Sequence, residues 1–590
     1  MDNEQLTFEL SKRPTAKGFP ELRWTGKRPY DITQYYPAQL RERYGEECTN
    51  GEYTGWINKI FWGDNLQVMS HLMKEYQGKV DLIYIDPPFD SKADYKKKIE
   101  VKGTGTVMSD STSFEEKQYG DIWTNDEYLQ FMFERLIIMR ELLSKTGSIF
   151  LHCDWHKASY LRCLMDEVFG LDCFRNEVIW HYADNFQGNV KGFATNHNNI
   201  FWYSKGMTFT SNPVMIPLDK PTKRDKRIWS TELGKLVSAR NPDGSLIYET
   251  FTEKKADDVW EIGQSSTTKS ASKEFLGYPT QKPEKLLERV IKASTNPGDL
   301  VFDCFMGSGT TQSVAMKLGR RFIGADINLG AIQTTTKRLI SVANDLKNNE
   351  KPLSDDTIKY TGFEVYNVNN YDFFRNPVEA RDLIIQALEI QPFPQSNVWD
   401  GELDGRMVKI MPVNHIATKA DLEELKANLP YKTYEKRKAD SPTQPVERIT
   451  IVCMGHEPDL KASLEYELSD YKLDIQIVDI LRDKSDLQLK REAEAEVVRE
   501  GNKLVIRSFY PMNLMQKLSL QKEYVEDWRQ LVESVMIDWN YDGVVMQPSV
   551  TDIPDKKDIV KGVYDIPKEA GTIKVKITDL LSESLEVEVE

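Results

Sequence analysis

Cysteine is scarce in this sequence, and the cysteines present are not spaced as metal ligands or as a disulfide framework. Six cysteines occur in 590 residues, and no two of them form a C-x-x-C pair. Small secreted proteins are rich in paired cysteines, whereas scattered ones are typical of reduced proteins. This usage therefore predicts free thiols and a cytoplasmic location.

Long apolar runs and basic excess are also missing. No run reaches the roughly 20 apolar residues of a membrane-spanning helix, and the first residues lack the basic and apolar regions of a signal peptide. We therefore expect no membrane association. The net charge is −15 and the isoelectric point about 5.3. An acidic chain is disfavoured as a uniformly non-specific nucleic-acid binder, although it can carry a local basic patch.

The stretch from Asp81 to Phe89, Asp-Leu-Ile-Tyr-Ile-Asp-Pro-Pro-Phe, is the most informative part of the chain. Its apolar run predicts a buried parallel strand that stops at Asp86. Pro87 and Pro88 cannot extend a sheet, so a stiff loop follows at the carboxyl end of the strand, where open α/β sheets bind ligands. Asp86 and a proline carbonyl can accept hydrogen bonds from an amino group on a planar base, and Phe89 can stack on that base. The alternative is an ordinary turn with a buried phenylalanine.

Strand and helix patterns alternate along the first 346 residues, which predicts an α/β fold with a doubly wound sheet. The periodicity places helices at 125–144, 158–169 and 284–294. It places strands at 148–152, 178–180, 200–203, 300–305 and 321–325.

A glycine turn follows the expected strand at 300–305. Asp303-Cys-Phe-Met-Gly-Ser-Gly-Thr310 reads as strand, turn and helix, and Gly307 and Gly309 would let the backbone approach a phosphate or the carboxylate of an amino-acid-like cofactor. The pattern lacks the lysine of a P-loop. Asp326 ends the next strand, where an acid can bind both hydroxyls of a ribose.

Three other segments have open interpretations. Residues 90–121 form a polar stretch that is too long for a simple connection between two elements. Loops of this length are commonly lids or binding loops. In 205–276 the periodicity fails, and the segment contains a basic run at 220–227 together with Trp229, Phe251 and Trp260, which suits a nucleic-acid surface and a surface insertion about equally. His152-Cys-Asp-Trp-His156 lacks the second ligand pair of a zinc site, so we expect no metal there.

Taken together, the two main motifs resemble those of amino-methylating DNA methyltransferases. Asp86-Pro-Pro-Phe89 resembles the catalytic motif, and the 303–309 stretch resembles the cofactor motif. In this chain the catalytic motif comes first and the cofactor motif comes late. That order is similar to the circularly permuted beta group, which includes the modification subunits of type III restriction systems. Trp62-Gly-Asp-Asn65 and Tyr278-Pro-Thr-Gln-Lys-Pro283 resemble further motifs of the group. Two departures are Phe89, where tyrosine is common, and Tyr278, where histidine is common.

The resemblance implies an enzyme that transfers a methyl group from S-adenosylmethionine to a flipped base in double-stranded DNA. It implies a catalytic site of Asp86, Pro87, Pro88 and Phe89, with no metal. The cofactor-binding residues that it implies are Asp64, Thr280, Lys282, Asp303, Phe305, Gly307, Ser308, Gly309, Thr310 and Asp326. From the sequence alone, Asp64 is better explained as a helix N-cap. Adenine N6 is the expected target and cytosine N4 the alternative. A non-catalytic recognition subunit of a nuclease or helicase complex is a second alternative.

The expected domain organisation follows from these motifs. Residues 1–50 form an N-terminal arm, and 51–346 form the Rossmann-like methyltransferase domain, with a target-recognition insertion at 205–276. Residues 347–431 connect to a linker at 432–445. The C-terminal extension, 446–590, is expected to be an α/β and β module that docks a restriction or helicase partner or a second copy of the chain.

Overall fold

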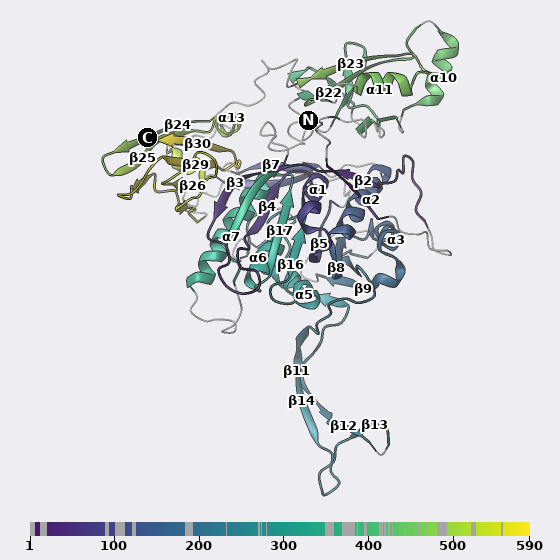
Figure 1. The fold of residues 1–590 in the computed structure, drawn as a ribbon, viewed down its shortest axis with the longest axis vertical. Helices are drawn as coiled ribbons and strands as arrows, with labels where there is room; N and C mark the ends of the chain where they lie inside the picture. Colours follow the sequence, from purple (N-terminus) through teal and green to yellow (C-terminus); the bar gives the residue numbers. More distant parts are fainter. Residues whose placement is uncertain are drawn as a thin grey trace.

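The structure is a computed structural model in which a large sheet, covered by helices, carries an extended arm and two smaller modules (Figure 1). It describes the chain apart from residues 1–5, 12–20, 89–93, 101–112, 121–124, 183–192, 232, 270–271, 273, 279, 349–358, 369–380, 382–383, 386, 394–397, 412–416, 418–420, 423–424, 427–428, 443, 457–459, 481–492, 521–524, 526, 556–557 and 590. Among the described residues, no helix has the length and apolar character needed to cross a membrane.

The central sheet has ten strands in the order β15-β9-β10-β8-β5-β16-β17-β4-β18-β3. In that order the strands are Val259–Glu261, Phe174–His181, His197–Ser204, Leu143–Cys153, Val80–Ile85, Leu300–Asp303, Arg321–Asp326, Asn58–Trp62, Phe363–Val368 and Ala38–Tyr44. The six strands from β8 to β18 run parallel, while β10 is antiparallel to both of its neighbours and β3 is antiparallel at the edge. The prediction of a mixed α/β fold with a mostly parallel sheet is confirmed.

Both faces of this sheet are buried. Leu82 and Tyr84 of β5 belong to one hydrophobic cluster, and the alternate residues Ile83 and Ile85 belong to another. Because successive strand side chains point to opposite faces, this division means that helices cover both sides. One cluster includes α1 (Asn65–Tyr76), α2 (Asn125–Leu142) and α3 (Ala158–Phe169). The other includes α5 (Glu284–Ser294), α6 (Thr310–Lys317) and α7 (Leu329–Asn348).

Most expected elements of this domain are present, with small shifts at their ends. Helices α3 and α5 match the predicted ranges, whereas the strand expected at 300–305 stops at Asp303, where the glycine loop begins. The long polar segment after Phe89 contains a pair of antiparallel strands, β6 (Asp94–Glu100) and β7 (Ser113–Gly120).

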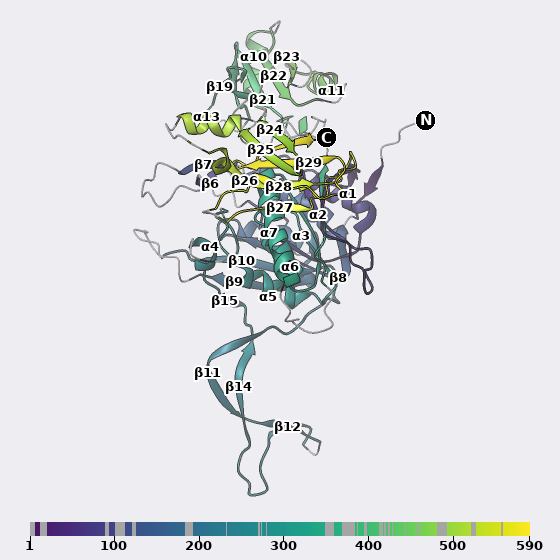
Figure 2. The same cartoon turned by 90° about the vertical axis from the view of Figure 1, so that its left-hand side faces the viewer.

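The insertion at 205–276 is more regular than its sequence suggested. Residues 215–255 of it form an arm of two antiparallel ribbons, which projects from the body in Figures 1 and 2, whereas β15 (Val259–Glu261) joins the central sheet. The first ribbon pairs β11 (Met215–Asp225) with β14 (Tyr248–Lys255), and the second pairs β12 (Arg227–Ser230) with β13 (Lys235–Ser238). Periodicity failed there because the strands are exposed on both faces, so no buried face imposes alternation.

The chain beyond residue 390 forms two modules. A five-stranded sheet contains the strands β19 (Gln391–Pro392), β20 (Gly401–Leu403), β21 (Arg406–Ile410), β22 (Glu447–Cys453) and β23 (Leu473–Asp479). The prediction of a linker at 432–445 is wrong, because the helix α10 (Tyr431–Asp440) occupies most of that segment. Its Tyr434 is fully buried in the module core, and tertiary packing of that ring supports a helix in an otherwise charged segment.

The last module is mostly β, with one helix, α13 (Met512–Leu520), and it packs against the methyltransferase domain. Its strands are β24 (Glu494–Glu500), β25 (Lys503–Tyr510), β26 (Val532–Asp538), β27 (Val550–Asp552), β28 (Val563–Asp565), β29 (Ile573–Asp579) and β30 (Ser584–Val589), and Figure 2 shows several of them lying beside α7. Lys576 of β29 forms a buried ion pair with Glu42 of the edge strand β3. The Arg43 amide also donates to the Met546 carbonyl at 2.9 Å. These contacts cover the edge of the large sheet.

Candidate active site

Acidic side chains follow four neighbouring parallel strands. Asp86 follows β5, Asp303 ends β16, Asp326 ends β17 and Asp64 follows β4. The carboxyl ends of parallel strands meet at one edge of a sheet, so the strand order brings together acids that are far apart in the chain. All four were singled out from the sequence.

Asp86 is the one of these four acids with a buried carboxylate oxygen that accepts no hydrogen bond from a described residue. One oxygen, Oδ2, accepts a hydrogen bond from the Lys282 ammonium. The other, Oδ1, is buried and accepts no hydrogen bond from any described residue, and His152 Nδ1 lies 3.6 Å from it. Desolvation raises the pKa of Asp86, and the Lys282 charge counteracts part of that rise. Pro87 is buried and Pro88 half-buried, as a rigid loop requires, while Phe89 lies outside the described residues.

Behind Asp86 lies a polar group that the sequence did not reveal as a unit. His152 Nδ1 is 2.9 Å from Tyr84 Oη, and the Asn198 amide nitrogen is 2.9 Å from His152 Nε2. An amide nitrogen only donates, so this contact leaves the ring proton on Nδ1. Burial holds the pKa of His152 well below its usual value, so the ring is neutral. No group of three metal-ligating side chains exists among the described residues, this histidine included.

The glycine loop is held together by two of the acids. Asp303 accepts from the Phe305 amide at 3.0 Å and from the Thr311 hydroxyl at 2.6 Å, and desolvation raises its pKa to about 7. Asp326 accepts from the Gly307 amide at 2.9 Å, and desolvation raises its pKa to about 6. These contacts fold the loop between β16 and α6 against the end of β17.

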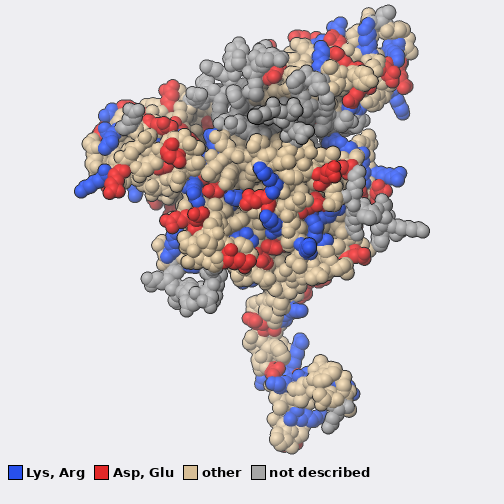
Figure 3. Space-filling view, viewed as in Figure 1, with Lys and Arg blue, Asp and Glu red and all other residues tan. Residues whose placement is uncertain are grey.

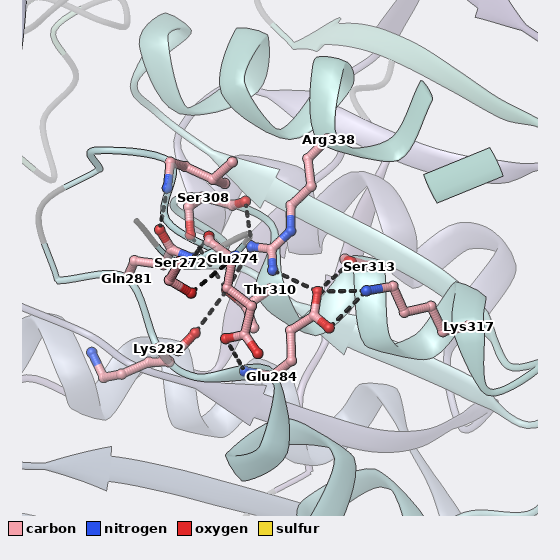
Figure 4. A network of polar contacts seen from close by, with 11 residues as sticks. Ser272, Glu274, Gln281, Lys282, Glu284, Ser308, Thr310, Ser313, Lys317 and Arg338 are labelled. Atoms are coloured by element: carbon pink, nitrogen blue, oxygen red, sulfur yellow. Dashed lines mark hydrogen bonds and ion pairs between the residues drawn. The ribbon is translucent and has the colours of Figure 1, made fainter. Parts of the chain in front are cut away.

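A buried arginine fixes the far side of the same loop (Figure 4). Arg338 of α7 donates to the Ser308 carbonyl at 3.2 Å, to Thr310 Oγ1 at 2.8 Å and to Glu284 at 2.9 Å. Glu284 also binds Lys317, and these two cations lower its pKa against the effect of burial. We did not predict Arg338 from the sequence. The pattern that could have revealed Arg338 is its position on the inward face of α7, three residues after the buried Thr335.

The remaining two predicted residues occupy structural positions. Asp64 caps α1 by accepting from the Leu66 amide at 2.9 Å, and it pairs with Arg135 at 3.1 Å. The N-cap interpretation of Asp64 is therefore observed. Thr280 has an exposed side chain and a φ of 62°, in the left-handed region. Its carbonyl accepts from Lys282 Nζ at 3.0 Å. A cofactor role for either residue stays a prediction.

A parallel sheet whose edge joins an open carboxylate to a glycine loop is the architecture of an enzyme that brings a nucleoside-containing cofactor to an acceptor group. Comparison with known proteins identifies the family. Residues 80–337 match the model of the N6/N4 methyltransferase family, described as DNA methylase.

Individual relatives agree with that match. The chain is 31% identical to type II methyltransferase M.EcaI of Enterobacter cloacae over 57% of this chain and 84% of the relative. It is 32% identical to type II methyltransferase M1.MboII of Moraxella bovis over 46% of this chain and 92% of the relative. It is also similar to the crystal structure of the M1.HpyAVI–SAM complex, at 19% identity, with a TM-score of 0.30, covering 48% of this chain and 98% of that one.

The chain therefore belongs to the N6/N4 DNA methylase family. It is an S-adenosylmethionine-dependent DNA methyltransferase that modifies an exocyclic amino group, as the resemblance of its motifs implied. The match spans the Asp86 loop, the insertion and the glycine loop, and it stops before the C-terminal modules.

Proposed function

We propose that this protein methylates N6 of an adenine that has been flipped out of double-stranded DNA, as the modification enzyme of a restriction-modification system. The observation that carries the proposal is the Asp86 carboxylate, which has one oxygen paired with Lys282 and a second, buried oxygen that accepts no hydrogen bond among the described residues. A buried acceptor of this kind costs free energy unless a donor completes it. An exocyclic amino group is such a donor.

The chemistry follows from that hydrogen bond. The lone pair of the target amine is delocalised into the base, and donation of its N–H bonds to Asp86 Oδ1 and to the Pro87 carbonyl localises the pair on nitrogen and orients it. S-adenosylmethionine supplies an electrophilic methyl group when bound. The N–C bond would form as the S–CH3 bond breaks, and Asp86 is positioned to stabilise the positive charge that develops on the attacking nitrogen until that nitrogen loses a proton. Phe89 remains the residue proposed to stack on the base, at a flipping cost of about a few kcal/mol.

The residues around the glycine loop fit the cofactor. A Cβ at position 307 would lie 3.3 Å from the Tyr278 ring, a tight contact, and the φ of 49° there also favours glycine. Asp326 remains partly exposed and retains acceptor capacity for ribose hydroxyls. We propose that Phe305, Gly307, Ser308, Gly309, Thr310 and Asp326 hold S-adenosylmethionine, that Asp303 shapes their loop, and that Asp64 and Thr280 border the site.

DNA recognition is assigned to the arm of the insertion at 205–276. Basic side chains lie along it (Figure 3), and Trp229, Leu233 and Tyr248 are 63%, 63% and 59% exposed. Basic side chains can bind the phosphate backbone of DNA, and exposed aromatic rings can stack on its bases. This combination suits a DNA-contacting surface.

The C-terminal modules are proposed to dock a restriction or helicase subunit or a second copy. The chain is 24% identical to the HindVI Mod subunit, described as a probable type III restriction-modification enzyme of Haemophilus influenzae. Such a system modifies genomic DNA, so a cytoplasmic location belongs to this proposal.

The test incubates the purified protein with S-adenosylmethionine and unmethylated genomic DNA, followed by digestion to nucleosides and mass analysis. N6-methyladenine is expected. N4-methylcytosine would keep the mechanism and replace the target base. Absence of both products, with S-adenosylmethionine binding intact, would favour a recognition subunit instead.

A further inference from the structure

Lys282 reaches the catalytic carboxylate. Its side chain and that of Asp86 are only 10% and 17% exposed, and its ammonium donates to Asp86 Oδ2 and, at 3.0 Å, to the Thr280 carbonyl. An ammonium and a carboxylate are both unfavourable away from water unless each has a partner. The two groups therefore stabilise each other in their charged forms.

The backbone around Lys282 is built to hold it there. Thr280 adopts a left-handed φ of 62°, which is unfavourable for a residue with a Cβ, and its carbonyl accepts from the ammonium. On the other side, the Lys282 carbonyl accepts from Thr310 Oγ1 at 3.3 Å, and Pro283 then starts α5 (Figure 4). Lys282 thus links the glycine loop through its main chain to Asp86 through its side chain.

We propose that Lys282 is a positioning residue for methyl transfer, which fixes the Asp86 carboxylate through Oδ2 and orients it for the target amino group. The inference rests on the function proposed above. It gives Lys282 a role through Asp86 in place of the cofactor contact that the resemblance implied. Lys282 holds the carboxylate at Oδ2, while Oδ1 is buried 3.6 Å from His152 Nδ1.

The surroundings of Asp86 make a fixed cation necessary. Among the described residues, the titratable groups that face Asp86 are Lys282, His152, Tyr84, Cys153 and Asp303. His152 is neutral, and Tyr84, Cys153 and Asp303 contribute no positive charge, so within this described set Lys282 is the cation that opposes the desolvation of the Asp86 carboxylate. Without it, desolvation would act on Asp86 unopposed, and the carboxyl would take up a proton at higher pH.

The experiment compares Lys282→Met, Lys282→Arg and a control, Lys285→Met, whose lysine is exposed on α5. S-adenosylmethionine affinity is measured by calorimetry without DNA, and the single-turnover methylation rate is measured against pH. Ionised Asp86 is the stronger hydrogen-bond acceptor, and loss of Lys282 removes the charge that lowers the pKa of Asp86, so the acidic limb of the rate profile moves upward. We expect a shift of at least about one pH unit and a rate about 100-fold lower at pH 7 for Lys282→Met.

The companion variants sharpen that result. Lys282→Arg keeps the charge, so its acidic limb is expected within about half a pH unit of the wild-type limb, and Lys285→Met should match the wild type in every measurement. Cofactor affinity should change less than about threefold in Lys282→Met. A tenfold loss of cofactor affinity with an unmoved acidic limb would make Lys282 a cofactor ligand and overturn the proposal. An unmoved limb with unchanged affinity would overturn it too.

A thermal-unfolding cycle provides a readout that needs no activity. Lys282→Met should lower the melting temperature at pH 8, because it leaves the Asp86 charge unpaired, and the same substitution in an Asp86→Asn background should lower it much less. Equal losses in both backgrounds would refute the pairing. The proposed function fails separately, when the wild-type protein makes no N6-methyladenine, and the unfolding cycle still reports on Lys282 in that case.

Discussion

Asp303 and Asp86 lie at the ends of adjacent parallel strands, yet the structure uses their carboxylates differently. Both oxygens of Asp303 accept hydrogen bonds from its own loop, from the Phe305 amide and the Thr311 hydroxyl. Asp86 has an oxygen that accepts none from the described residues. An acid satisfied from within shapes the backbone, whereas an acid with buried, open acceptor capacity is prepared for a donor from outside. The same residue type at equivalent sheet positions thus supports two functions.

The largest expected effect comes from replacing the Asp86 carboxylate, whose Oδ1 accepts no hydrogen bond from the described residues. Asp86→Asn keeps the shape of the side chain but presents an amide, which loses the charge and half of the acceptor capacity. We expect methyl transfer to fall by at least about 10³-fold, while S-adenosylmethionine affinity stays within about threefold. Single-turnover assays and calorimetry measure the two quantities. Asp345→Asn, at an exposed position on α7, is the matched control and should behave as wild type. Equal loss of cofactor binding in Asp86→Asn would remove the distinction between the two acids.

A second variant loosens the glycine loop without touching Asp86. Arg338→Met removes the buried cation that binds Ser308, Thr310 and Glu284, and it leaves the Glu284 carboxylate with Lys317 as its remaining cation. We expect a loss of about 3 kcal/mol of unfolding free energy, measured by urea titration. Lys317→Met breaks only the partly exposed pair and should cost less than about 1 kcal/mol. Similar costs for both variants would contradict the importance of the buried contacts.

The pH dependence of stability tests the satisfied acid. Burial raises the pKa of Asp303 to about 7 in the folded protein, from an ordinary value of 3.8. Between these values the folded state holds a proton that the unfolded state has lost, so stability falls as pH rises from about 4 to about 7. Asp303→Asn removes this contribution, and the difference from wild type should change by up to about 3 kcal/mol across that window. Urea titrations at pH 5, 6, 7 and 8 measure it; a constant difference would show that Asp303 does not titrate there.

The smallest effects separate the two glycines of the loop. A Cβ at position 309 would lie 2.5 Å from Thr335 Cγ2 at a φ of 70°, whereas one at position 307 would lie 3.3 Å from the Tyr278 ring at a φ of 49°. We expect Gly309→Ala to cost about 2–3 kcal/mol of unfolding free energy and Gly307→Ala about 1 kcal/mol. Gly307→Ala should instead weaken S-adenosylmethionine binding more than its stability cost suggests. Chemical unfolding and calorimetry on the pair decide between these outcomes.

Local patterns in the sequence predicted most of the fold and part of the candidate site. Helices α3 and α5 were predicted to the residue, because their apolar faces repeat at helical spacing and a proline or glycine marks an end. The arm and α10 were missed for one physical reason. The strands of the arm are exposed and are stabilised by pairing with each other, whereas α10 is a charged helix stabilised by a single buried ring. Neither element therefore shows a periodic apolar pattern in the sequence.

The sequence by itself determined the family, the sheet and the identity of the acids, because strand ends, prolines and glycines constrain the backbone locally. Only the tertiary structure decided what each acid does. The order of the strands sets Asp86 beside Lys282, which lies 196 positions further along the chain, and sets Asp326 against Gly307. Hydrogen bonding and desolvation between such distant residues have no local signature, so the division between the open and the satisfied carboxylate appears only when the chain is folded.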